Sequence, residues 1–370
     1  MKKVGTNEIT ANQYCFIIIG TMIGIAILSA PKDLIKASGQ DAWISVIFGM
    51  MYPFYLVIMG ILLFKRYPDK NILQISKICF GSFIGGLFNF VFMLQFLFFA
   101  ATRSAGLDDI LQTYIASFLT PAKLIAAFIL AAAFTASFEL KVIGRVNEMI
   151  FYLMLILILC PIAVLRDGSI LNIMPVLQNS IGKIIVGSIQ TVYSYCGVEI
   201  LFIIYPRIAD KENMVKASLK AVIVTALIYV WFVFSTIYYL DIDIVPKYGW
   251  PFLSVTSSVN MPVINNFRYI FLFLWSIVAL KTISNYFFTF TFIFNDFFKG
   301  LDFKKLCYAM YPFVAYVTIL FSDEAFRRNI LRKAAPNIIL FNIIGITLIV
   351  IITYLKKEGK YERKTNCNSN

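Results

Sequence analysis

Apolar residues occur along the chain in long runs that short polar stretches separate. A membrane-spanning helix needs about 20 mostly apolar residues, and ten of the runs approach or exceed that length. They cover residues 13–30, 42–64, 83–106, 121–139, 148–165, 183–205, 218–240, 267–297, 305–321 and 335–355. This pattern predicts an all-α polytopic membrane protein with ten transmembrane helices.

The connections between the runs are short, and several contain turn-forming residues, such as Tyr-Pro-Asp at 67–69 and Arg-Asp-Gly at 166–168. Ten helices divide evenly into two groups of five. We therefore expect a first five-helix repeat over residues 1–166 and a second over residues 167–355. A polar cytoplasmic tail follows over residues 356–370.

Glycines interrupt one run in each half at corresponding positions. The first run carries Gly20 and Gly24 in its interior and Pro31 at its far end, and the sixth run has Gly197 near its middle. Glycine weakens a helix interior by about 1 kcal/mol relative to alanine. Two interpretations remain open. The glycines allow close helix packing, or both helices are broken and offer free N–H and C=O groups to a ligand at mid-membrane.

Composition excludes several classes of protein. Of the 370 residues, 60% are hydrophobic and 14% are charged, whereas a soluble domain has roughly 25% charged residues. The chain has no histidine, which removes Ser-His-Asp triads and histidine metal sites. Its six cysteines are scattered without a C-x-x-C pair, so no disulfide framework or zinc site is indicated. We expect no enzymatic activity, no metal, no cofactor and no nucleic-acid partner.

The net charge of +13 reflects membrane topology, because the basic residues lie in short loops. With the N-terminus in the cytoplasm, about 20 Lys and Arg residues fall on the cytoplasmic side and about 12 outside, which favours both termini inside. The basic stretch at 327–333 is an exception, since it falls in an outer loop. Either late loops carry weak topological information, or this loop faces an acidic partner or lipid headgroups.

Charged residues at the outer ends of the helices have simpler interpretations. Arg103, Asp108 and Asp109 end the third run, and we expect them to anchor it at the membrane interface. Two acidic residues at 323–324 stand beside two arginines at 327–328, which predicts local charge pairing of little energetic value.

Several motifs resemble those of the spore germination receptor B-subunit family, which is GerAB-like and lies within the amino acid–polyamine–organocation transporter superfamily. The motifs are Ile9-Thr10-x-x-Gln13, Ile19-Gly20, Ile23-Gly24-Ile25-x-Ile27-Leu28-x-x-Pro31, Tyr195-x-Gly197-x-Glu199 and Pro206-Arg207. The resemblance covers nearly the whole chain. It implies a LeuT-like inverted 5+5 repeat with broken helices 1 and 6.

The resemblance also implies a function. A protein of this kind would be a germinant receptor subunit of the spore inner membrane, working with A-type and C-type lipoprotein subunits. It would bind an amino acid or a similar small nutrient at mid-membrane and signal germination to those partners.

The implied ligand site lies between segments one, three, six and eight. The carboxylate of an amino acid suits free N–H groups around Thr21 to Gly24, where the second half-helix of segment one begins. Its ammonium suits backbone carbonyls in the sixth segment, while aromatic residues line a side-chain pocket. With 36 Phe and 20 Tyr, a single aromatic more often packs or faces lipid. The predicted ligand-binding residues are Gly20, Thr21, Ile23, Gly24, Phe92, Gln95, Tyr193, Ser194, Tyr195, Cys196 and Gly197.

An ionisable residue inside the bilayer costs about 2.5–3.5 kcal/mol on insertion scales, and two of those within the apolar runs stand out. They are Glu199 and Lys281. They either pair with each other or titrate as a proton-coupling site. In the superfamily, segment eight packs against segment one, which implies that Lys281 mimics a coupling sodium ion and caps carbonyls freed near Gly20 and Gly24. A purely structural bond of Lys281 and a snorkelling Lys281 at a misplaced helix end are the alternatives.

Two functions therefore stand side by side. The first is the germinant receptor subunit, and the second is a proton-coupled amino acid permease that uses Lys281 and Glu199. An enzyme is disfavoured because the chain shows no nucleotide loop and no nucleophile–base pair. A channel is disfavoured because there is no filter-like repeat and no ring of charge.

Overall fold

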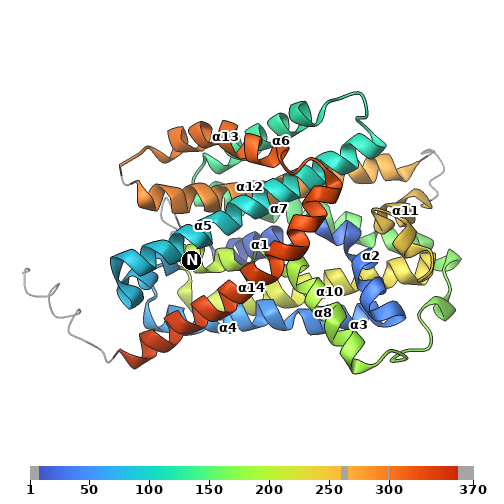
Figure 1. The fold of residues 1–370 in the computed structure, drawn as a ribbon, viewed down its shortest axis with the longest axis horizontal. Coiled ribbons are helices and arrows are strands. Elements are labelled where there is room, and N and C mark those ends of the chain that lie inside the picture. Colours follow the sequence, from blue (N-terminus) through green and yellow to red (C-terminus); the bar gives the residue numbers. More distant parts are fainter. Residues whose placement is uncertain (1–7, 260–265, 299, 357–370) are drawn as a thin grey trace, which may run out of the picture.

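The computed structural model describes residues 8–259, 266–298 and 300–356, and nearly all of its regular structure is helical (Figure 1). Most of the predicted tail at 356–370 and the two N-terminal lysines lie outside the described residues. The α-helices are α1 (Ala11–Met22), α2 (Ala26–Ser38), α3 (Ala42–Gly49), α4 (Met51–Arg66), α5 (Ile72–Tyr114), α6 (Pro121–Ala136), α7 (Leu140–Leu159), α8 (Ile181–Tyr195), α9 (Leu201–Ile204), α10 (Met214–Leu240), α11 (Pro251–Ser257), α12 (Phe267–Phe297), α13 (Phe303–Ile319) and α14 (Glu324–Leu355). Short 3-10 turns are η1 (Gly39–Asp41), η2 (Cys160–Asp167), η3 (Ile170–Asn172), η4 (Val198–Ile200), η5 (Tyr205–Arg207), η6 (Lys211–Asn213) and η7 (Val245–Lys247).

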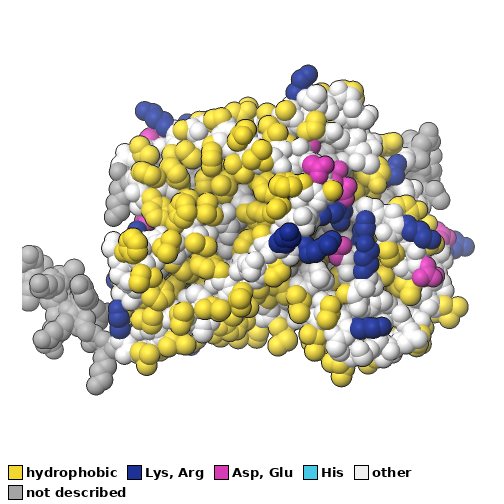
Figure 2. Space-filling model, viewed as in Figure 1, with side chains coloured by type: hydrophobic (Ala, Val, Ile, Leu, Met, Phe, Trp, Pro, Cys, Tyr) yellow, Lys and Arg dark blue, Asp and Glu magenta, His cyan; other side chains and the backbone are white. Residues whose placement is uncertain are grey.

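The helices and the surface are those of a multi-pass membrane protein. Within the described chain, six helical stretches are long and apolar enough to cross a membrane, and α8 with the helical turns after its break, bent by 48°, would be a seventh. Each of the ten predicted runs contains a helix. Hydrophobic side chains cover much of the face in Figure 2, as expected of a surface in contact with lipid.

The buried helix α1 lies at the centre of the fold, packed against α7, α10 and α12. All of its residues except Asn12 are buried, which explains why it is apolar on every side. It begins with a capping box, in which the Thr10 side chain accepts from the Gln13 N–H and the Gln13 side chain accepts from the Thr10 N–H. The Ile-Thr-x-x-Gln motif therefore has a structural reason: it starts the first helix.

The start of the chain is also joined to the end of the sixth predicted segment. The Ile9 N–H donates to the Arg207 carbonyl at 2.9 Å, and the Ala209 N–H donates to the Ile9 carbonyl at 3.0 Å. The Ala11 N–H donates to Asp210 Oδ1 at 2.7 Å. These bonds hold the ends of the two glycine-interrupted segments together.

Several boundaries and polar roles differ from the predictions. The predicted outer loop at 327–333 belongs to the first turns of α14, which Asp323 caps through the Phe326 N–H. The expected membrane-interface anchors are also different, since Arg103 and Asp108 are buried side chains of the long helix α5. Hydropathy did not predict the helical start of α14 or the burial of Arg103 and Asp108. A charged residue lowers the hydropathy of a segment in the same way whether it meets water or lies inside the protein.

Of the two arginines expected to form local ion pairs at the start of α14, only one does so. Arg328 forms an ion pair with Glu324 at 2.6 Å. Arg327, however, is buried and forms its ion pair with Asp109 on α5 at 2.9 Å. The second pair joins two helices that are distant in sequence, which local spacing does not reveal.

Candidate functional site

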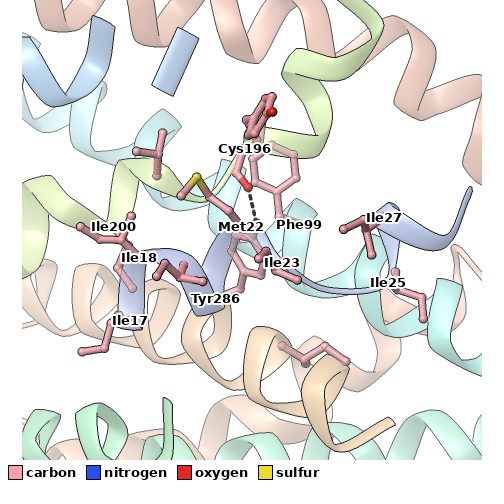
Figure 3. Close-up of a cluster of buried hydrophobic side chains, with 14 of the residues drawn as sticks. Ile17, Ile18, Met22, Ile23, Ile25, Ile27, Phe99, Cys196, Ile200 and Tyr286 are labelled. Atoms are coloured by element: carbon pink, nitrogen blue, oxygen red, sulfur yellow. Dashed lines mark hydrogen bonds between the residues drawn. The ribbon is translucent and has the colours of Figure 1, made fainter. Parts of the chain in front are cut away.

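The first helix of the fold is broken between α1 and α2, at residues 23–25 (Figure 3). Ile23 adopts an extended conformation, with φ −94° and ψ 111°, so the helical ladder ends there. The freed carbonyls meet a side chain of α12. The Thr282 hydroxyl lies 2.8 Å from the Gly20 carbonyl and 2.7 Å from the Ile23 carbonyl. The hydroxyl has a single hydrogen, so these two carbonyls share one donor with the Val278 carbonyl of α12, which lies at 3.2 Å.

A second break follows α8, at Cys196 and Gly197. Gly197 has φ +116°, a conformation in which glycine has no side chain to strain. A Cβ atom there would lie 2.6 Å from the Tyr286 hydroxyl and 2.7 Å from the Thr21 carbonyl. The second break therefore lies directly against the end of α1. Both glycine-interrupted segments are therefore broken helices, and close packing of unbroken helices is not the explanation.

Two tyrosines hold the breaks in place. The Tyr229 hydroxyl on α10 lies 3.2 Å from the Met22 carbonyl and 3.0 Å from the Ser194 carbonyl, one from each broken helix. The Tyr286 hydroxyl on α12 donates to the Cys196 carbonyl at 2.8 Å. Figure 3 shows Met22 and Ile23 beside Cys196 and Tyr286. Both breaks are thus fixed by hydroxyl groups from the helices that surround them.

Glu199 stabilises the second break from within. Its Oε2 accepts from the Gly197 N–H at 2.6 Å, and its Oε1 accepts from Asn342 Nδ2 at 3.0 Å and from the Tyr52 hydroxyl. The side chain is buried. Glu199 therefore ties the end of the break to α4 and α14.

Lys281 is buried on α12 next to Gly20, whose missing side chain leaves room for it. Its Nζ would be 3.1 Å from a Cβ atom at Gly20. No hydrogen bond or ion pair of Lys281 occurs between described residues, so it does not pair with Glu199. Its neighbour Thr282 contacts the carbonyls that we expected Lys281 to cap.

A polar cluster surrounds the same part of α1. The side-chain amides of Asn147 and Asn285 bond each other in both directions at 2.9 Å. Asn285 Nδ2 also donates to the Thr21 hydroxyl at 3.0 Å, and this hydroxyl donates to the Ile17 carbonyl. Neither asparagine was predicted to belong to the site, although Asn285, an amide inside the run 267–297, was a usable signal.

A cavity of about 780 Å³ opens beside the two breaks. Its walls come from α2, α4, α5, α8 and α14. Ile25 and Ala26 line it on the side of the first break, and Tyr193 and Ser194 on the side of the second. The cavity therefore reaches both broken helices.

The predicted ligand-binding residues divide between the cavity and the helices around it. Tyr193 and Ser194 line the cavity. Phe92 instead stacks on Phe88 and meets Phe96 edge-on, and the Tyr195 hydroxyl donates to the Val46 carbonyl at 3.2 Å. Ile23, Gly24, Cys196 and Gly197 form the breaks, while Gly20 and Thr21 lie in the last turn of α1. The last member is the buried Gln95, whose amide atoms have no hydrogen-bond partner among the residues described.

Arg103 lines the cavity and does not anchor α5 at the membrane interface, which was the prediction. It lines the cavity from α5 with only 4% of its surface exposed. Its Nη2 donates to the Tyr193 carbonyl at 3.2 Å, and its guanidinium carbon lies 4.3 Å from the centre of the Tyr193 ring. The sequence held a signal for this role, since Arg103 lies inside the run 83–106 and an ionisable residue within a membrane segment usually has a function.

Acidic and thiol side chains are dispersed. Within residues 8–259, 266–298 and 300–356, no three Asp, Glu or Cys side chains lie close enough to hold a metal ion. The site consists instead of backbone carbonyls, hydroxyl groups, amides and a guanidinium, which suit a small polar organic ligand.

Comparisons with known proteins agree on one family. The sequence model of a family described as "Spore germination protein" matches residues 8–327. Spore germination protein KB of Bacillus subtilis is 26% identical over 258 residues, which cover 68% of this chain and 68% of that protein. Spore germination protein YndE of the same organism is 27% identical, covering 68% of this chain and 70% of its own length. Spore germination protein GerQB of Bacillus cereus is 24% identical, with 67% and 69% covered.

Proposed function

Because this chain belongs to the spore germination protein family, we propose that it is the ligand-sensing membrane subunit of a nutrient germinant receptor. It binds an amino acid or a similar small molecule at mid-membrane. Its ten helices form a 5+5 inverted repeat in the spore inner membrane, with both termini in the cytoplasm. A-type and C-type lipoprotein subunits receive the signal.

The observation that carries this proposal is the contact between the two breaks beside a cavity. Gly197 lies against the Thr21 carbonyl, and Tyr229 bonds to carbonyls of both broken helices. Paired breaks in corresponding segments are the usual binding site of inverted-repeat transporters. A ligand that contacts both breaks would change how they pack against each other, and this is a means of signalling.

The cavity also suggests how binding reaches a partner. Residues of α14, including Ile339 and Ile343, form one wall, and Asn342 on the same helix bonds to Glu199 at the second break. A ligand would therefore contact α14 directly. Since much of α14 is at the surface, its movement is available to another subunit.

A proton-coupled permease is the alternative, and Lys281 is the observation that favours it. A buried lysine without an acidic partner in the described chain can gain and lose a proton during transport, because no ion pair holds it in the charged form. It lies beside Gly20, close to the first break. Both functions use the same site and differ in whether the ligand crosses the membrane.

Uptake by proteoliposomes distinguishes them. We expect the purified chain to bind labelled amino acid without moving it across the membrane. Saturable uptake by this chain alone, driven by a proton gradient, would contradict the receptor-only proposal and support the permease.

A germination assay then tests the breaks. Valine at Gly24 would crowd Thr282, whose Cγ2 lies 3.0 Å from a Cβ atom there, and valine at Gly197 would be strained by its positive φ. We expect spores with Gly24→Val or Gly197→Val to lose the response to nutrient. Gly86→Val is the matched control, because a Cβ atom at Gly86 meets nothing within 4 Å. Wild-type responses in both variants would refute a role for the breaks.

A further inference from the structure

The cavity beside the breaks is positively charged. Four arginines contribute to its lining, namely Arg103, Arg327, Arg328 and Arg332, whereas Asp33 is its one acidic lining residue within the described chain. Figure 2 shows Lys and Arg side chains gathered between the N-terminal part of α14 and α2, with a few Asp and Glu side chains beside them. The positive field therefore surrounds the way into the cavity.

Only two of these arginines are neutralised by a neighbouring acid. Arg327 pairs with Asp109, and Arg328 pairs with Glu324. Arg103 and Arg332 form no ion pair with another described residue. Arg332 is exposed, so water can solvate its charge. Arg103 is buried, so its charge has neither water nor an acidic partner in the described chain.

The bonds of Arg103 leave most of its donors free. A guanidinium has five N–H donors, and the one hydrogen bond found for Arg103 in the described chain goes to the Tyr193 carbonyl. Tyr193 also covers one face of the guanidinium. The group is thus fixed in orientation while its remaining donors lie at the cavity. Buried charges are normally paired, so this arrangement calls for an anion.

Arg103 is also next to the first break. One turn further along α5, Gly106 packs against Ile25, with a Cβ position 3.4 Å from Ile25 Cγ2. Ile25 and Ser194 line the same cavity as Arg103. An anion bound to Arg103 would therefore contact both broken helices.

We propose that Arg103 binds the carboxylate of the nutrient ligand. This inference rests on the proposed function and names the chemical class of the ligand, a small carboxylic acid. A planar guanidinium matches a carboxylate with two parallel hydrogen bonds. This differs from the expectation that N–H groups at the first break bind the carboxylate. One of them, the Ile23 N–H, already donates to the Ile19 carbonyl at 2.9 Å.

The other residues that line the cavity indicate what kind of side chain the ligand has. Beyond the arginines, the cavity wall is largely aliphatic, with Ile25, Val192, Ile339 and Ile343 among its members. A molecule with one carboxylate and a short apolar side chain fits this surface. An anionic lipid has similar end-group chemistry, but its headgroup would not need the buried donors of Arg103.

The test is a set of binding measurements on the full chain in nanodiscs of zwitterionic lipid. The probes are L-valine with L-valinamide and isovalerate, and L-leucine with L-leucinamide and isocaproate. Each set compares a zwitterion, the same molecule without its carboxylate, and the same molecule without its ammonium. We expect the carboxylates to bind and the amides to bind at least about thirty-fold more weakly, as for loss of one partner of a buried charge pair.

Variants assign the effect to Arg103. Arg103→Gln should lose the difference between acid and amide, with acid binding weakened about thirty-fold or more. Arg103→Lys keeps the charge and should retain part of the preference. Arg166→Gln is the matched control, since Arg166 is an exposed arginine of η2 that does not line the cavity. Thermal unfolding of each variant establishes that it is folded. If Arg103→Gln does not fold, Arg103→Lys takes its place in the comparison.

The outcomes separate this inference from the proposed function. If the amides bind as tightly as the acids, or if a folded Arg103 variant keeps wild-type preference, the inference is wrong and nutrient binding stands. If isovalerate or isocaproate binds through Arg103 and the amino acids do not, the inference stands and the amino acid proposal is wrong. If no probe binds, or only added anionic phospholipid binds in an Arg103-dependent manner, both are overturned.

Discussion

The hydroxyl group of Tyr229 offers the sharpest test of how the two breaks are coupled. It is fully buried and lies within hydrogen-bond distance of the Met22 and Ser194 carbonyls, at 3.2 Å and 3.0 Å. Tyr229→Phe removes this hydroxyl without changing the ring. We expect it to loosen both breaks, because a carbonyl of each broken helix loses the donor that the two share.

The magnitude follows from the cost of a buried carbonyl without a donor, about 1–3 kcal/mol. Since 1.4 kcal/mol is tenfold in an equilibrium constant, the opening of the breaks should become about 5- to 140-fold more frequent. Hydrogen exchange measures this at two amides. The Ile23 N–H bonds to the Ile19 carbonyl at the first break, and the Cys196 N–H bonds to the Tyr193 carbonyl at the second. Both should exchange faster.

Two further variants make the assay specific. Tyr286→Phe removes a donor from the Cys196 carbonyl alone, so it should accelerate exchange at the second break more than at the first. Tyr205→Phe is the matched control, because its buried hydroxyl contacts the Tyr67 and Lys70 carbonyls outside the breaks. If Tyr229→Phe leaves exchange at either Ile23 or Cys196 unchanged, the breaks are not coupled through this hydroxyl.

Two other substitutions distinguish the roles of neighbouring residues on α12. Thr282→Val keeps the shape of the side chain but removes the hydroxyl near the Gly20 and Ile23 carbonyls. It should destabilise the fold by about 1–3 kcal/mol in denaturant unfolding, and an unchanged midpoint would show that the break does not need this donor. Lys281→Met should leave unfolding unchanged or stabilise the protein, because no partner in the described chain is lost and a buried charge is removed. A loss of stability would instead indicate that the ammonium caps backbone carbonyls.

Most of the helices could be predicted from the sequence, because the hydrophobicity of a segment depends only on its own residues. Each of the ten predicted runs contains a helix, and Gly24 and Gly197 lie where the first and sixth of them break. The Ile-Thr-x-x-Gln motif marked the start of α1 correctly. Boundaries were less predictable, since α14 begins at Glu324 within a stretch that its charges made look like a loop.

The candidate site was only partly predictable. Tyr193 and Ser194 do line the cavity, but Arg103 was assigned to the membrane interface. Thr282, Tyr229 and Tyr286 were not singled out, although they hold the breaks. The sequence alone does not show whether a threonine or tyrosine in an apolar helix donates a hydrogen bond to a broken helix or only packs against its neighbours.

The sequence alone determined that the protein is a helical membrane protein and where its helices are interrupted, because apolar length and the freedom of glycine act within a few residues. Tertiary structure alone decided what occupies those interruptions. Tyr229 and Met22 are 207 residues apart along the chain, and Thr282 and Gly20 are 262 apart. Such bonds depend on which helix faces arrive together once the chain has packed. The same packing brought Arg103 to the cavity beside both breaks.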